Sequence, residues 1–432
     1  RLAAELDLDV RALAAASQGH TRVPLASTLA TSELAWASVL AAGATLGAGV
    51  AAAPDPLRIA ASYQSDRHLL INGAQPEVWS PLSRFWPVVD GWVRTHGNYP
   101  HHAAALRSGL SLSSRSAPED VSVALSRLTA DQAADRITAA GGVCVAVRPE
   151  QPHVDAALRQ HPLIELARLG EAPARPLHTG SALPLHGIRV LDLTRVIAGP
   201  VATRTLAFAG AEVLRIDPPD RDEFAWQHLD TGQGKRSALL DLEREPAHLH
   251  ALLTEADVIV LGYRPDGLSR LGLTPQSLAA QHPHLVIAQL SAWPGDRSPR
   301  GFDSIVQADA GISWIESPDG VTPGALPAQA LDHSAGYLLA AGVIAALRRR
   351  ASAGGTWYVR TSLRRVAAEL LGMPRGRRAE LPPYSAATQT CAVGDAAVTM
   401  ALPAVTWPGA PDVFAAPRRW GGDQPEWSAP AR

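Results

Sequence analysis

The sequence has few cysteines and almost no net charge. Its 432 residues include only two cysteines, Cys144 and Cys391, which lie too far apart in the chain to suggest a disulfide framework. The 39 basic residues nearly balance the 41 acidic residues, and a formal net charge of −2 argues against a general nucleic-acid-binding protein. No His/Cys cluster has the spacing of metal ligands, so we expect no metal site.

Long runs of large apolar residues are also scarce. Residues 34–53 carry no charge and would be long enough to span a membrane, but they are mostly Ala and Gly with Ser and Thr. We interpret them as a buried helix hairpin that is broken between Gly43 and Gly49. The chain begins at Arg1 rather than Met, so we expect its true N-terminus to lie upstream, and we recognise no signal peptide. We therefore expect a cytoplasmic protein with no membrane or nucleic-acid partner.

The most informative stretch is residues 185–217, which predicts a strand, a loop, a helix and a second strand. Residues 188–193 form a short β-branched and leucine run typical of a buried parallel strand. Pro200 suits the first turn of a helix, and Gly210 suits the left-handed position that ends one. Such a crossover brings a loop and a helix N-terminus to the carboxyl edge of a sheet, where ligands bind.

Two interpretations of this ligand site arise. Asp217 closes the second strand, as the ribose-binding acid does in dinucleotide folds. However, the loop has one glycine, Gly199, where the dinucleotide fingerprint needs three, so an NAD(P) oxidoreductase is the weaker interpretation.

The second interpretation is a resemblance that continues in order along the chain. The similar blocks are RVLDLTRVIAGP (residues 189–200), GAEVLRID (210–217), GQGKRS (232–237), DVIVLGYRP (257–265), RLGL (270–273) and GFD (301–303). Together they resemble the class III CoA-transferase family, the CaiB/BaiF-like group that includes formyl-CoA and carnitine CoA-transferases. The similar blocks cover roughly residues 183–371.

The predicted fold class is α/β, with a Rossmann-like parallel sheet covered by helices on both faces and a smaller α+β domain. Strands predicted at 188–193, 212–217, 238–242, 257–261 and 285–290 alternate with helical patterns, which indicates a parallel sheet. We divide the chain into a degenerate CoA-transferase-like segment (1–180), the small-domain portion of a fused copy; a Rossmann-like CoA-transferase domain (183–373); and a short C-terminal tail (374–432).

Asp332 is the candidate catalytic residue. It precedes an apolar helical pattern at 333–347, and an aspartate there is most simply an N-cap. The resemblance implies a second role, as the nucleophile that forms an aspartyl-CoA thioester. A carboxylate at a helix N-terminus is expected to be held ionised, which suits that attack.

The resemblance also implies a binding site for coenzyme A or an acyl-CoA, which act as substrates, with no permanently bound cofactor. The residues expected to contact it are Arg195, Ile197, Ala198, Arg215, Lys235, Tyr263, Arg264, Arg270 and Arg300. Arginine and lysine are the side chains that hold phosphate groups.

The predicted activity is transfer of CoA from an acyl-CoA donor to a small carboxylic acid, with a homodimer as the expected assembly. A related branch, the α-methylacyl-CoA racemases, uses a histidine and an aspartate as a proton relay. Phe302 occupies the position of that histidine and cannot transfer a proton, which favours the transferase. A racemase-like isomerase and a CoA-binding pseudoenzyme are the alternatives.

Overall fold

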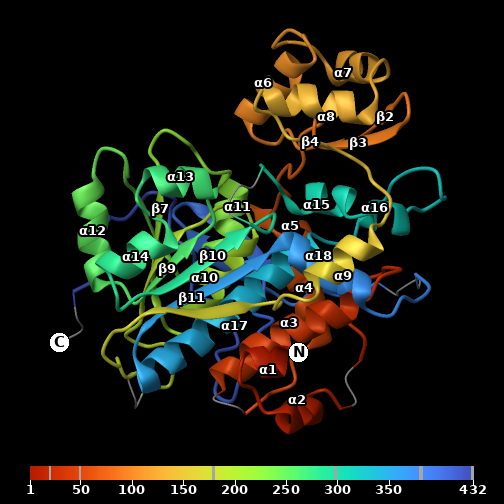
Figure 1. Ribbon diagram of the computed structural model, residues 1–432. Helices are drawn as coiled ribbons and strands as arrows, with labels where there is room; N and C mark the ends of the chain where they lie inside the picture. The colour runs from red at the N-terminus through yellow and green to blue at the C-terminus, as the bar shows by residue number, and fades with distance from the viewer. Residues whose placement is uncertain (19–20, 48–49, 178–180, 296–298, 379–382, 430–432) are drawn as a thin grey trace.

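The computed structural model describes residues 1–18, 21–47, 50–177, 181–295, 299–378 and 383–429. In these residues the strands form three sheets, and the largest has seven strands. Figure 1 shows the main body of the molecule with a smaller unit, drawn in orange, at its top. The predicted fold class, a mostly parallel sheet flanked by helices plus a smaller α+β unit, is confirmed.

The central sheet has the strand order β5-β11-β10-β9-β6-β7-β8. Its strands are β5 (Glu165–Gly170), β6 (Arg189–Leu193), β7 (Glu212–Asp217), β8 (Arg236–Leu239), β9 (Val258–Leu261), β10 (Val286–Ser291) and β11 (Thr356–Ser362). Neighbouring strands run parallel, except that β5 is antiparallel to β11. The predicted strands are therefore confirmed, and their ends differ from the prediction by at most three residues.

Helices cover both faces of this sheet. Their bounds are α3 (Thr31–Leu46), α4 (Pro56–Tyr63), α10 (Ala198–Phe208), α11 (Ala225–Thr231), α12 (Pro246–Glu255), α13 (Pro265–Arg270), α14 (Pro275–Gln281), α15 (Asp303–Asp309), α16 (Ile312–Ile315), α17 (Ala330–Ala353) and α18 (Leu363–Gly372). Val190 and Val258 pack on the side of α3, α10 and α17, whereas the next residues, Leu191 and Ile259, pack on the side of α12, α13 and α14. This alternation is the period of two of a strand buried on both faces.

The crossover from β6 to β7 has the predicted features. Pro200 lies in the first turn of α10, and Gly210 follows the helix with a φ of 98°. A left-handed φ of this kind favours glycine, which explains why the chain turns there into β7.

The apolar helices α3 and α17 form part of the core. By length and composition α17 could cross a membrane, but its apolar window is completely buried by other parts of the protein. The buried helix predicted within residues 34–53 is present as α3. It ends at Leu46, inside the range from Gly43 to Gly49 where we expected a break, and the next helix, α4, starts only at Pro56, so the described part of residues 34–53 holds one helix rather than a hairpin. The backbone of Thr406 passes close to Gly43, where a side chain would not fit. Gly49 lies outside the described residues.

The smaller unit is built from the N-terminal part of the chain. It comprises β2 (Phe85–Val88), β3 (Gly91–Thr95), β4 (Cys144–Ala146), α6 (Pro100–Gly109), α7 (Pro118–Leu125) and α8 (Ala130–Ala139). Trp86, Val93, Leu106 and Ile137 contribute to its own hydrophobic core. The unit contacts α15, and the N–H of Arg148 donates to the carbonyl of Ala308 at 3.0 Å. These contacts place it beside the carboxyl edge of the central sheet.

Other N-terminal elements belong to the main body. These are α1 (Leu2–Glu5), α2 (Val10–Ala16), α5 (Ser65–His68) and α9 (Pro152–Leu158). The third sheet joins β1 (Leu70–Ile71) to β13 (Ala396–Ala401) and β12 (Thr388–Val393) near the C-terminus. The predicted boundaries near residues 180 and 374 stay predictions. Strand β5 hydrogen-bonds within the central sheet although it precedes the first boundary.

Candidate active site

A cavity of about 250 Å³ lies where the loops after β6, β9 and β10 meet the N-terminus of α17. In a parallel sheet this carboxyl edge is the usual place for a ligand. The predicted site residues that line the cavity are Arg195, Ile197, Ala198, Tyr263, Arg264, Arg300 and Asp332.

The loop after β6 has an unusual backbone. Val196 has a φ of 73°, a conformation that is rare for a β-branched residue and is found mainly at functional sites. Gly199 follows, and a side chain there would meet Thr194 at 2.4 Å. This explains why the loop has a glycine at that position. The close packing presents Arg195, Ile197 and Ala198 to the cavity.

Asp332 is the third residue of α17 rather than its N-cap, which corrects the sequence-based interpretation. The residue before the helix is Gln329, and the cap comes instead from Asp303. The N–H of Asp332 donates to a carboxylate oxygen (Oδ2) of Asp303 at 2.9 Å. Among the described residues, no side chain or backbone group hydrogen-bonds to the carboxylate of Asp332, so this group is free to react with a ligand in the cavity.

Asp303 and Asp332 form a pair of buried carboxyl groups. Burial raises the pKa of Asp303 to about 6, although hydrogen bonds from Asp332, Gln307 and Leu331 oppose the shift. The pKa of Asp332 is raised well above its ordinary value, first by burial and then by the charge of Asp303. Burial and a like charge thus oppose the ionised form that the helix N-terminus was expected to favour.

Several arginines meet at the mouth of this cavity. Arg221, Arg264 and Arg300 all line it, and burial together with the charges of the other two lowers the pKa of Arg300. Within the described part of the chain, neither Arg264 nor Arg300 has a carboxylate at ion-pair distance. Clustered arginines of which two lack an acidic partner favour the binding of an anion.

A second cavity of about 340 Å³ adjoins the first and shares Arg221 and Tyr263 with it. Arg270 lines this second cavity rather than the first, together with Leu193, Ile216 and other residues at the ends of β6, β7 and β8. The two cavities together provide a long binding surface that begins at Asp332.

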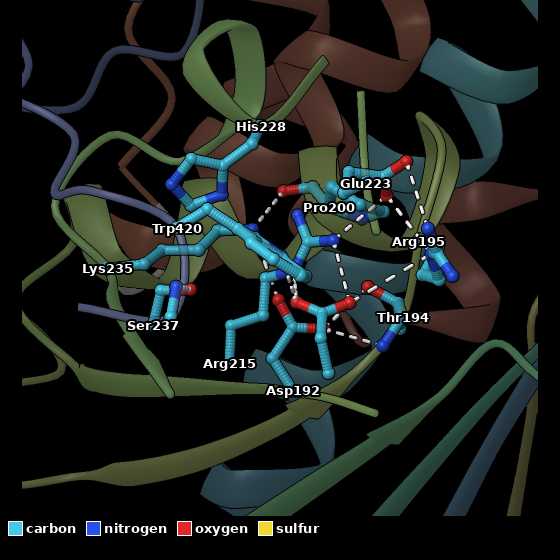
Figure 2. Close-up of polar contacts among 12 residues, drawn as sticks. Asp192, Thr194, Arg195, Pro200, Arg215, Glu223, His228, Lys235, Ser237 and Trp420 are labelled. Atoms are coloured by element: carbon cyan, nitrogen blue, oxygen red, sulfur yellow. Dashed lines mark hydrogen bonds and ion pairs between the residues drawn. The ribbon is translucent and has the colours of Figure 1, made fainter. Parts of the chain in front are cut away.

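Arg215 and Lys235 lie in neither cavity, which corrects their predicted role. Figure 2 shows both side chains in a buried network beneath the loop. Arg215 pairs with Asp217 at 2.7 Å and with Glu223 at 2.9 Å, and Lys235 pairs with Asp192 at 3.1 Å. Arg215 lies in β7 and Lys235 directly precedes β8. Each side chain is only 1% exposed, so neither can reach a ligand.

The buried network instead fixes the binding loop. The ammonium group of Lys235 donates to the carbonyl of Pro200 at 2.9 Å and to the hydroxyl of Thr203 at 2.6 Å, which anchors the first turn of α10. Glu223 connects Arg215 to Arg195, whose guanidinium lies 3.3 Å from the same carboxylate. Burial lowers the pKa of Lys235 to about 8, and the charge of Asp192 opposes that shift.

The sequence analysis missed residues that the small unit contributes to the cavity. Tyr99, His101 and His102 lie around the start of α6 and line it. The hydroxyl of Tyr99 donates to Glu223 at 3.0 Å, and the ring of His102 meets that of Phe302 edge-on, with centroids 5.8 Å apart. Burial lowers the pKa of His102 to about 3, so its imidazole is neutral. The Tyr-Pro-His-His run at residues 99–102 was the available sequence signal. No local pattern, however, predicts that this run packs against Phe302, which lies about 200 positions later in the chain.

Known proteins match the same half of the chain. The model of CoA-transferase family III matches residues 185–382. This segment is similar to CoA-transferase family III. A probable fatty acyl-CoA transferase from Mycobacterium tuberculosis is 35% identical over 208 residues, which is 44% of this chain and 52% of that protein. Cinnamoyl-CoA:phenyllactate CoA-transferase from Clostridium sporogenes is 31% identical, over 43% of this chain and 50% of its own length.

The chain thus spans about half the length of the curated family III relatives it matches. Among solved structures, the M. tuberculosis protein aligns with 34% identity and a TM-score of 0.40, covering 46% of this chain and 56% of the other. A CaiB/BaiF family protein from Brucella suis aligns with 25% identity and a TM-score of 0.42, covering 50% of this chain and 65% of the other.

Proposed function

We propose that this chain binds an acyl-CoA and transfers its CoA to a small carboxylic acid, with Asp332 as the nucleophile. One observation carries the proposal: the unbonded carboxylate of Asp332 shares a cavity with the arginines Arg264 and Arg300, within a family III segment. The names of the matching relatives, which are CoA-transferases acting on different acids, support the reaction class but not a particular substrate.

The two cavities suit the two ends of a CoA molecule. Arg221, Arg264 and Arg300 supply donors for its phosphate groups. The second cavity, lined by Leu193, Ile216 and Arg270, provides both apolar surface and a cation for the nucleotide end. In this placement the thioester end of the acyl-CoA passes the loop of Ile197 and Ala198 and reaches Asp332.

The proposed reaction proceeds in two halves. A carboxylate oxygen of Asp332 attacks the thioester carbonyl, the carbon–sulfur bond breaks, and CoA leaves as the thiolate, so that a mixed anhydride remains. The thiolate then attacks the aspartyl carbonyl, which releases the donor acid and leaves an aspartyl-CoA thioester. In the second half the acceptor carboxylate attacks this thioester, and the same steps in reverse yield the new acyl-CoA and free Asp332.

The buried environment sets a condition on the first step. Asp332 must lose its proton before it can attack, and its raised pKa favours the protonated form. The ionised fraction grows as the pH rises, so the reaction is expected to accelerate with pH. A carboxylate removed from water is also a stronger nucleophile once it is ionised.

A racemase-like isomerase is the second candidate, because the structure places an imidazole in the cavity. Phe302 occupies the position where the racemases have their relay histidine. The ring of His102, however, meets the ring of Phe302 edge-on and lines the same cavity as Asp332. An imidazole and a carboxylate could together exchange a proton next to a thioester carbonyl.

Ligand-dependent melting tests the binding part of the proposal. A ligand that binds only the folded state raises the melting temperature, by an amount that grows with the logarithm of its concentration above Kd. CoA should raise it and NAD should not. Arg300→Gln should reduce the effect of CoA, whereas the control Arg127→Gln, at an exposed residue that lines none of the three cavities, should not. Stabilisation by NAD but not by CoA would overturn the proposal in favour of a dinucleotide enzyme.

A further inference from the structure

A third cavity, of about 310 Å³, lies between the small unit and the main body. Its wall combines Arg94 of β3, Phe85 of β2, Ser304 of α15, Asp66 of α5 and the loop residue Trp79. Among the residues that line the two cavities, none is shared with the active-site cavity. The third cavity is therefore a separate space, and the proposed transfer reaction gives it no role.

Arg94 is the unusual group in this cavity. It is only 9% exposed, and its guanidinium lies over the rings of Trp79 at 5.5 Å and Phe85 at 4.9 Å. Within the described part of the chain it has no ion pair or hydrogen bond, and its Nε is buried without a partner. A buried cation without an acidic partner is costly, and two aromatic rings offset only part of that cost.

The carboxylate of Asp303, whose charge acts on Arg94, does not form an ion pair with it. The charge of Asp303 acts on Arg94, but the two groups form no ion pair within 4.0 Å, and the Asp303 carboxylate already accepts from Asp332 and Gln307. Asp66 lines the cavity as well, but among the described residues it forms no ion pair with Arg94, and burial raises the pKa of its carboxyl group. The guanidinium of Arg94 therefore keeps N–H donors without an acceptor, and such donors suit bidentate binding of a carboxylate.

The rest of the wall indicates what kind of anion fits. The hydroxyl of Ser304 is buried and has no hydrogen-bond partner, so it supplies a second donor. Trp79, Phe85, Leu326 and two alanines form the apolar part of the wall, and Arg67, Gln307 and Gln329 complete it. An apolar wall suits a hydrocarbon chain better than a bare inorganic anion, and the carboxyl group of Asp66 disfavours a second negative charge on the ligand.

We propose that this third cavity binds a small apolar monocarboxylic acid, whose carboxylate accepts from Arg94 and Ser304. Its hydrocarbon chain lies against Trp79, Phe85 and Leu326. The site uses neither Asp332 nor the arginines of the active-site cavity, so the proposal does not rest on the proposed transferase activity.

Fluorine NMR with trifluoromethyl-labelled butanoate as the probe tests this assignment directly. The probe should bind the parent protein, and unlabelled butanoate should displace it, whereas the uncharged isostere butanamide should not. Arg94→Met should weaken binding about tenfold or more, because it removes the charge-assisted donors but retains an unbranched side chain. Ser304→Ala should weaken it several-fold.

Two further variants separate this cavity from other anion sites. Arg84→Met is the matched control, since Arg84 is an exposed arginine near the same sheet that lies over Trp86 and outside the cavity. It should bind the probe like the parent, and so should Arg300→Gln, which alters the active-site cavity. If Arg94→Met fails to fold, Arg94→Lys keeps the charge without the planar fork and should still weaken binding.

Three results would overturn the proposal. These are a parent protein that does not bind the probe at millimolar concentration, an Arg94 variant that binds it as the parent does, and displacement of the probe by inorganic phosphate as effectively as by butanoate. The last result would show a general anion site rather than one for an organic acid.

Discussion

The backbone N–H of Asp332 donates a hydrogen bond to the carboxylate of Asp303, at 2.9 Å. One acid thus caps the helix that carries the other, and both are buried. The arrangement fixes the position of Asp332 and at the same time opposes its ionisation, since the charge of Asp303 raises its pKa further. The two effects can be separated by substitution.

Asp303→Asn should shift the pH dependence of the reaction. The amide oxygen can still accept from the N–H of Asp332, but the negative charge is gone, so the pKa of Asp332 should fall. The rate of acyl-CoA-dependent labelling of Asp332 rises as this group ionises, so its acid limb should move to lower pH. Asp309→Asn, on the same helix but outside all three cavities, should leave the limb in place. An unchanged limb in Asp303→Asn would show that the two carboxyl groups do not interact.

Arg264→Gln and Arg300→Gln should each weaken CoA binding by about 1–3 kcal/mol, as expected for charge-assisted contacts. Arg270→Gln should weaken CoA binding as well, but it should affect dephospho-CoA or pantetheine derivatives less, because Arg270 lines only the second cavity. Calorimetry on the parent and variants measures these differences. Parental affinity in all three variants would place CoA elsewhere.

Lys235→Met should destabilise the fold. Any effect on CoA binding should be indirect, because Lys235 does not line the cavity but anchors the loop after β6. The substitution leaves the carboxylate of Asp192 fully buried with only hydroxyl and backbone donors, from Thr194 and Thr203. Breaking a buried pair in this way costs about 3–5 kcal/mol of unfolding free energy, measurable by urea denaturation.

The double variant Lys235→Met with Asp192→Asn should recover part of that stability, since no unpaired charge is left buried. The control Arg244→Met removes an exposed ion pair with Asp241 and should change stability by only about 0.5 kcal/mol or less. A Lys235→Met protein as stable as the parent would contradict the structural role of the network.

Incubation of a chiral 2-methylacyl-CoA in deuterated water tests the racemase-like alternative. The transferase account predicts no deuterium at the α-carbon, as read by mass spectrometry. Exchange at a catalytic rate that is lost in His102→Phe would instead assign His102 and Asp332 as the proton relay and contradict the transferase account.

The sequence predicted those features that depend on local patterns. The strands of the central sheet, the helix that begins before Pro200 and the loop from Arg195 to Ala198 all follow from short apolar runs and turn residues. Arg215 shows what such patterns leave out. It looks like a ligand cation by position, but the strand is buried on both faces, so its guanidinium can only pair internally with Asp217 and Glu223.

Contacts distant in the sequence account for the other differences. The cap of α17 could not be predicted from Asp332 alone, because the better acceptor, Asp303, comes from a different helix. The arrival of Tyr99 and His102 at the cavity depends on how the small unit docks on α15, which no periodicity records.

The covalent role of Asp332 is the central claim, and trapping of the acyl-CoA-treated protein tests it most directly. The parent, incubated with an acyl-CoA and then with hydroxylamine, should carry a hydroxamate at Asp332, located by peptide mass spectrometry. Asp332→Asn keeps the N–H that bonds to Asp303 and should still bind CoA, but it should show neither the label nor CoA transfer. An Asp332→Asn protein that transfers CoA at the parental rate would contradict the account.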